Sequence, residues 1–162
     1  MSQQASDLEY AGFWSRVGAS LIDTILMCIV TLPLLVAVYG RAYWDSETFF
    51  LGPADFLISY VLPAAVVIVL WMRLATTPGK MAIGATIVDA ATGAKPTSRQ
   101  CLIRYLGYYV SMLPLFLGFF WVGIDARKQG WHDKMAGTVV VRRKAGSSEP
   151  VRFDAAGANP SA

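Results

Sequence analysis

The sequence predicts an all-α membrane protein with two transmembrane helices, a third apolar segment and a small cytoplasmic β element. Hydrophobic residues fill 55% of the 162 positions and charged residues only 15%, and the mean hydropathy is +0.46. Soluble domains of this size are seldom so apolar. Three apolar runs account for the excess, and each can reach the roughly 20 residues that cross a hydrocarbon core about 30 Å thick.

The first span is predicted at residues 17–39. Arg16 precedes it, and Asp23 lies inside it seven residues later. Because seven residues are close to two helical turns, both charges fall on one face of one helix, about 10 Å apart along its axis. A carboxylate in hydrocarbon is costly and is kept only where it has a partner or a use. We therefore predict that this face is the working surface, either as a charge pair that locks helix packing or as a ligand site.

The second span is predicted at residues 56–75, where Arg73 can extend its side chain to the interface. The third apolar run, residues 101–124, contains Pro114 and has Arg104 near its start. Its 24 residues are enough for one crossing but too few for the roughly 40 that two crossings need.

Basic residues indicate the orientation of the chain. The loop between the first two spans holds only Arg41, whereas the N-terminus, the second connection and the tail hold the others. The positive-inside rule therefore places those three segments in the cytoplasm. A re-entrant pair of half-helices hinged near residues 114–118 satisfies this arrangement, and a plain third span is the alternative. In the re-entrant arrangement, residues 83–89 can pair with residues 138–142 as a small cytoplasmic sheet.

Arg73 and Arg104 enter the membrane on the same predicted side as Asp23, so several arginines can compete for one carboxylate. An excess of positive charge there suits an anionic ligand as well as a locked salt bridge. Asp125, which closes the last apolar run, is expected to return to that face and contact these arginines.

The Thr-Pro-Gly-Lys segment at residues 77–80 lacks the pattern of a phosphate-binding loop and predicts a turn that offers Lys80 to lipid phosphates.

The sole histidine, His132, stands beside Asp133 near the end of the charged block. One histidine and two separated carboxylates are few ligands for a transition metal, and no nucleophile stands at a recognisable spacing. We therefore predict no enzyme activity, no metal and no cofactor. Trp131, His132 and Asp133 instead predict an amphipathic interfacial turn that can dock a partner protein, with Asp133 capping it or pairing with a nearby basic residue, Arg127 or Lys134.

Three motifs follow one another along the chain. They read Ala-Gly-Phe-Trp-x-Arg at 11–16, Thr-Pro-Gly-Lys-Met-x-Ile-Gly at 77–84, and Gly-Ile-Asp-x-Arg-x-Gln-Gly-Trp-His-Asp-Lys-x-Ala-Gly-Thr at 123–138. In this order they resemble the RDD family of membrane proteins. The family is named for an arginine and two aspartates. Arg16 and Asp23 match the first two, and both Asp125 and Asp133 fit the second aspartate.

The resemblance implies a membrane domain at residues 10–143 of a bacterial inner-membrane protein, with transport of an unidentified ligand suggested for the family. Residues 1–9 then form an N-terminal tail. Residues 144–162, rich in Gly, Ser, Pro and Ala, are predicted to be disordered.

Two classes of function fit these features. The first is transport of an ion or small solute by an oligomer, because two or three spans are too few to enclose a pathway alone. The second is a non-transporting accessory or regulatory subunit of another membrane protein complex. Intramembrane charges favour transport.

The expected partners are the lipid bilayer and either a second copy or another membrane protein. Nucleic acid is not expected, because the basic residues that give the net charge of +3 flank apolar segments.

Overall fold

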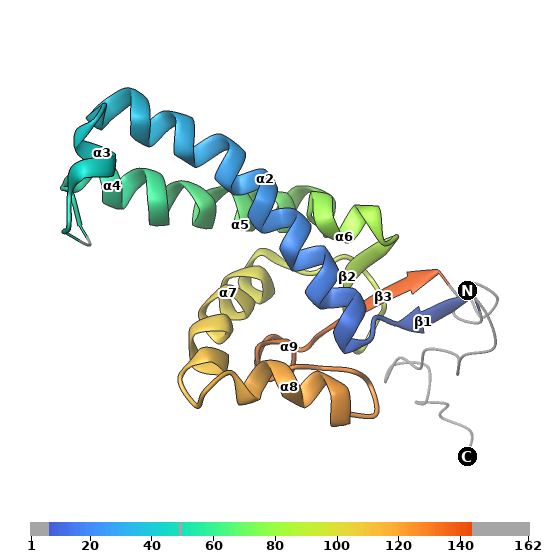
Figure 1. Ribbon diagram of the computed structural model, residues 1–162. Coiled ribbons are helices and arrows are strands. Elements are labelled where there is room, and N and C mark those ends of the chain that lie inside the picture. Colours follow the sequence, from blue (N-terminus) through green and yellow to red (C-terminus); the bar gives the residue numbers. More distant parts are fainter. Residues whose placement is uncertain (1–6, 49, 144–162) are drawn as a thin grey trace, which may run out of the picture.

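The computed structural model describes residues 7–48 and 50–143, which form mostly helices with a three-stranded sheet at one end (Figure 1). The strands are β1 (Leu8–Tyr10), β2 (Ala85–Asp89) and β3 (Thr138–Arg143). The helices are α2 (Phe13–Tyr39), α3 (Ala42–Asp45), α4 (Pro53–Phe56), the π-helix η1 (Leu57–Val61), α5 (Leu62–Leu74), α6 (Pro78–Ala82), α7 (Ser98–Met112), α8 (Leu117–Ile124) and α9 (Trp131–Ala136). The predicted disordered tail, residues 144–162, lies outside the described residues.

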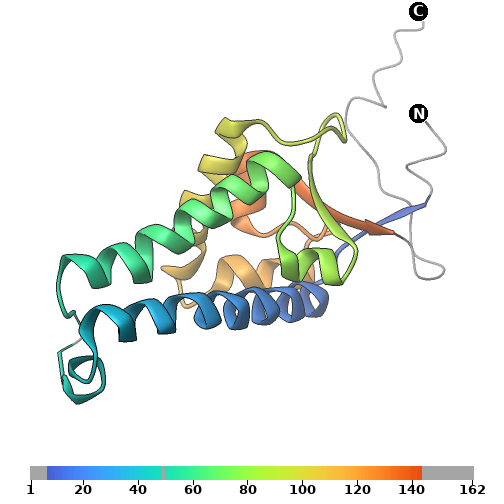
Figure 2. The same ribbon diagram turned by 90° about the horizontal axis from the view of Figure 1, so that it is seen from above.

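Within residues 7–48 and 50–143, two helices are long and apolar enough to cross a membrane, as predicted. They are α2 and the helix Pro53–Leu74, which α4, η1 and α5 form together. α2 begins at Phe13 instead of residue 17, and its 27 residues extend about 40 Å at 1.5 Å per residue. The two helices lie side by side and are connected through α3 at the end far from the sheet (Figure 2).

The third apolar segment breaks at the predicted place. α7 ends at Met112 and α8 begins at Leu117, with a bend of 102° between them. Leu115 and Phe116 have positive φ angles of 50° and 62°, so the chain turns sharply straight after Pro114. The segment is therefore a pair of short helices and not one straight span.

The predicted pairing of the second connection with the C-terminal block is confirmed. β2 and β3 are antiparallel, with Ala85 opposite Arg142. β1 pairs with the other edge of β3, which gives the strand order β1-β3-β2. The sequence does not predict β1, whose Leu8 and Glu9 fall in the predicted N-terminal tail, because three residues carry too little alternation to mark a strand.

A small core connects the helices to the sheet. Trp71 of α5 and Cys101 of α7 pack with Ile87 of β2 and Val140 of β3, and all four side chains are almost fully buried. Ala11, which follows β1, joins the same cluster and donates its N–H to the Val140 carbonyl at 2.9 Å. The sheet therefore fixes where α2 begins.

Candidate functional site

Asp133 is the centre of a buried charge cluster. Its side chain, at the start of α9, is fully buried and forms ion pairs with Arg16 of α2 and Arg104 of α7. The distance from Arg16 Nη1 to Asp133 Oδ2 is 2.5 Å. The same carboxylate accepts the Gly130 N–H at 2.9 Å, which caps α9. One carboxylate thus connects three helices, and we call Arg16, Arg104 and Asp133 the Asp133 cluster.

The two arginines are held by further acceptors. Arg16 donates from Nε to the Ala11 carbonyl at 3.0 Å and from Nη2 to the Lys128 carbonyl at 2.7 Å. Arg104 donates to the Thr138 hydroxyl at 2.8 Å, and its guanidinium lies 5.3 Å from the centre of the Trp71 ring. These contacts compensate for removing the charges from water.

The arginines set the ionisation of Asp133. Burial alone would raise the pKa of Asp133, because it disfavours the charged form. The positive charges of Arg104 and Arg16 outweigh burial and hold the pKa of this carboxyl well below its usual range. Asp133 is therefore ionised at neutral pH, and the Asp133 cluster keeps one positive charge in excess.

His132 is buried and neutral. Its ring stacks on Tyr108 with 4.3 Å between ring centres, and its Nδ1 lies 3.3 Å from the Ser111 hydroxyl. Burial lowers the pKa of His132 to about 3. The attraction of Asp133 opposes this shift, whereas repulsion from Arg104 and Arg16 adds to it. The imidazole carries no charge at neutral pH.

The predicted interfacial turn at Trp131, His132 and Asp133 is wrong for two of the three residues. His132 is 3% exposed and Asp133 is 0% exposed, whereas Trp131 is half-buried. Gly107 is the physical reason: a Cβ there would lie 2.7 Å from the His132 Cα, so its absence lets α9 pack tightly against α7. Asp133 does cap its helix as expected, but it pairs with distant arginines and not with the nearby basic residues.

Asp23 does not pair with Arg16, although both lie on α2. Its carboxylate accepts the Thr77 hydroxyl at 2.5 Å and the Gly79 N–H at 2.7 Å. Both donors belong to the start of α6, where a Cβ on Gly79 would lie 2.0 Å from the Ala19 carbonyl oxygen. The Thr-Pro-Gly sequence thus supplies a hydroxyl donor, a proline suited to a first helical turn and the only residue small enough for this approach.

The other predicted site residues lie apart from the cluster. Asp125 does not reach the arginines, contrary to expectation, because it accepts the N–H groups of Arg127 and Gln129 and pairs with Lys134. Arg73 is exposed at the end of α5, where its carbonyl accepts the Lys95 ammonium at 2.7 Å. Of the two candidate aspartates, Asp133 is the one that contacts Arg16, so the geometry favours Asp133 as the family's second aspartate.

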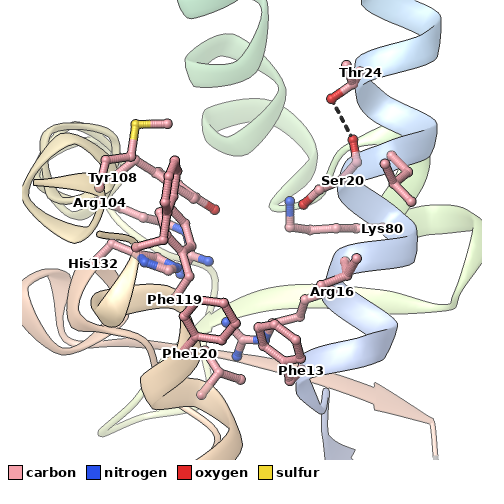
Figure 3. Close-up of a pocket in the computed structure, with 15 residues that line it drawn as sticks. Phe13, Arg16, Ser20, Thr24, Lys80, Arg104, Tyr108, Phe119, Phe120 and His132 are labelled. Atoms are coloured by element: carbon pink, nitrogen blue, oxygen red, sulfur yellow. Dashed lines mark hydrogen bonds between the residues drawn. The ribbon is translucent and has the colours of Figure 1, made fainter. Parts of the chain in front are cut away.

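A cavity of about 380 Å³ lies beside the Asp133 cluster, between α2, α7 and α8 (Figure 3). Lys80 points into it from α6, and Arg104, Tyr108 and His132 face it from the opposite side (Figure 3). Lys80 is only 8% exposed and belongs to helix α6, so the segment predicted as a turn at residues 77–80 is the start of a short helix with a buried lysine. Its ammonium donates to the Thr77 hydroxyl at 3.3 Å and lies 5.8 Å from the centre of the Trp71 ring.

The rest of the cavity wall is mostly apolar. It consists of Phe13, Val17, Leu21, Met112, Phe116, Phe119, Phe120 and Val122, with the polar Ser20 and Thr24 from α2. Sequence reasoning missed this wall, because apolar residues in a span look the same whether they face lipid or a cavity. Among the described residues, no three His, Cys, Asp or Glu side chains gather in a way that holds a metal ion.

The fold and the charge cluster define a small helical membrane protein whose first span is tied to its C-terminal helices by one buried carboxylate. The RDD family model matches residues 10–137, and the chain belongs to this family. Over 140 residues it is 28% identical to the uncharacterized membrane protein YteJ of Bacillus subtilis (strain 168), a match that covers 83% of this chain and 82% of that protein.

A second relative matches a shorter part of the chain. Over 75 residues the chain is 37% identical to the uncharacterized protein RP437 of Rickettsia prowazekii (strain Madrid E), and this match covers 46% of the chain. It spans only 41% of the length of the Rickettsia protein. No solved structure matches the chain.

The first prediction compares the two aspartates. Asp133→Asn leaves two buried arginines without their shared anion, and removing one partner of a buried pair costs about 3–5 kcal/mol. Asp125→Asn changes a partly exposed ion pair and should cost much less. The measurement is the amount of membrane-inserted protein and its thermal midpoint in mild detergent. Equal losses in the two variants would contradict the assignment of the second aspartate to Asp133.

The second prediction concerns pH. The unfolded chain protonates His132 below its usual pKa of about 6.5, whereas the folded chain does so only near pH 3. Stability should therefore fall as the pH drops through about 6.5, by up to about 1.4 kcal/mol per pH unit. Thermal midpoints between about pH 5 and 7, a range above most carboxyl pKa values, measure this slope. His132→Gln should flatten it, and an equally steep slope in that variant would show that His132 is not its source.

Proposed function

We propose that this protein transports a small anionic solute across the bacterial inner membrane as an oligomer, with the cavity beside the Asp133 cluster as its binding site. The observation that carries the proposal is the charge of this cavity. Three cationic side chains, Arg16, Lys80 and Arg104, line it. Among the described residues, two carboxylates contact this set directly or through Thr77, and they belong to Asp23 and Asp133.

The charge excess favours a ligand with one negative charge. Asp133 neutralises one of its two arginines, and His132 adds no charge at neutral pH. Among the described residues Lys80 forms no ion pair, and it reaches Asp23 only through the Thr77 hydroxyl. A buried ammonium of this kind is a good partner for a carboxylate or phosphate. The aromatic wall suits an apolar body attached to that anion.

The sheet supports the proposed topology. Its strands come from the N-terminal segment, the second connection and the C-terminal block, and the first two strands each pair with the third. Strands of one sheet lie on one side of a bilayer, because an open sheet does not cross hydrocarbon. The broken pair α7 and α8 should then be re-entrant, and the positive-inside rule places the sheet and the N-terminus in the cytoplasm.

The oligomer follows from the small number of helices. Two spans and a re-entrant pair do not enclose a pathway, so a second copy has to supply the missing wall. α2 leaves room for such a copy, since only 6% of its most apolar stretch is buried. The same uncovered face supports the second candidate, an accessory subunit that binds another membrane protein. A stable foreign chain that co-purifies in mild detergent would favour this second candidate.

The third prediction tests transport with benzoate, which combines one negative charge with an apolar body. Concentration jumps on proteoliposomes adsorbed to a solid-supported electrode should give a saturable current with benzoate. Lys80→Gln should weaken the apparent affinity about tenfold or more, the loss expected for one hydrogen bond to a charged group. Lys95→Gln removes the same charge from an exposed site and is the matched control. A folded protein that gives no current with benzoate, acetate or phosphate would contradict the proposal.

A further inference from the structure

We infer that the anion comes from the bilayer: the cavity takes the phosphate of an anionic phospholipid, with the start of one acyl chain lying against α7 and α8. This inference rests on the anion site of the proposed function and names a class of ligand that this site takes. It draws on three independent features of the cavity, which are its opening, its charged end and its depth.

The cavity opens onto an apolar surface. Leu21, Met112, Phe116 and Phe120 line it and are nonetheless between 47% and 59% exposed. They belong to the first span, the broken pair and the turn within that pair. The rim is therefore continuous with the surface that faces hydrocarbon, and a ligand with an apolar chain can enter laterally without leaving the bilayer.

The inner end of the cavity provides hydrogen-bond donors. Lys80 is more than nine-tenths buried and has no carboxylate partner among the described residues. Arg104 lines the same cavity, and its buried Nε–H has no hydrogen-bond acceptor in the part of the chain that the structure describes. Phosphate oxygens are strong acceptors for both groups. One charge in excess matches the single negative charge of a phosphodiester headgroup such as phosphatidylglycerol.

The charged end also lies at headgroup depth. Arg16 stands one turn into α2, just after the sheet, and Lys80 lies in α6, just after the second span. Both therefore sit close to the boundary where lipid phosphates are found. A volume of about 380 Å³ is near the lower limit for ligand cavities, so it holds a headgroup and the first part of one chain. The remaining chain would lie on the exposed apolar surface.

The fourth prediction tests this inference by native mass spectrometry of the purified full chain. The protein is released from nanodiscs that contain equal amounts of phosphatidylglycerol and phosphatidylcholine with the same acyl chains. Phosphatidylglycerol should be retained at least about tenfold more, as one charge-assisted contact would give. Lys80→Gln should reduce retention to the phosphatidylcholine level, and Lys95→Gln should leave it unchanged. Equal retention of the two lipids by the wild type overturns the inference.

A second variant keeps the inference testable if Lys80→Gln fails to fold. Ser20→Phe adds bulk to the cavity wall from an exposed position of α2 and keeps every charge. It should abolish selective retention while the thermal midpoint stays within a few degrees of the wild type. Selective retention that persists in a folded Ser20→Phe protein places the lipid elsewhere and overturns the inference.

Two further results separate this inference from the proposed function. Selective lipid retention without a benzoate current leaves the lipid site standing and removes transport of soluble anions. A saturable benzoate current with equal retention of both lipids leaves transport of soluble anions standing and removes the lipid site. If the purified protein binds inorganic phosphate in the millimolar range but retains no phosphatidylglycerol selectively, the site recognises a free anion and the lipid source is wrong.

Discussion

The buried carboxylate of Asp133 is the interaction on which the rest of this structure depends. It joins Arg16, at the start of the first span, to Arg104 and α9, and Arg16 and Asp133 are 117 residues apart in the chain. Either arginine would be a costly uncompensated charge without it. The contact fixes α2 against the broken pair, and Asp23 fixes the same helix against α6. Arg16, Asp23 and Asp133 thus attach one helix at two points.

The same cluster gives the cavity its chemistry. Because one carboxylate faces two arginines, the Asp133 cluster keeps one positive charge beside a cavity lined by aromatic side chains. Lys80 adds a second buried cation, which Asp23 reaches only through a hydroxyl. A structural role and a ligand-binding role are therefore compatible here, since the groups that hold the helices also leave one charge for an anion.

Local features of the sequence predicted much of this fold. Apolar length located both spans, Pro114 located the break, and the pairing predicted between residues 83–89 and 138–142 located β2 and β3. The partner of Arg16 could not be predicted in the same way. Helical spacing puts Arg16 and Asp23 on one face, but it carries no information on which distant residue packs there. Asp125 and Asp133 fit the motif equally well, and only packing through Gly107 shows that Asp133 is the buried one.

A double-mutant cycle on Arg16→Gln and Asp133→Asn tests the central claim most directly. Unfolding free energies of the two single variants and the double variant are measured in the same detergent. If the carboxylate holds Arg16, the double variant should be less destabilised than the sum of the singles by more than about 1 kcal/mol. Effects that add to within about 0.5 kcal/mol would show that the two residues act independently. That result would contradict the account.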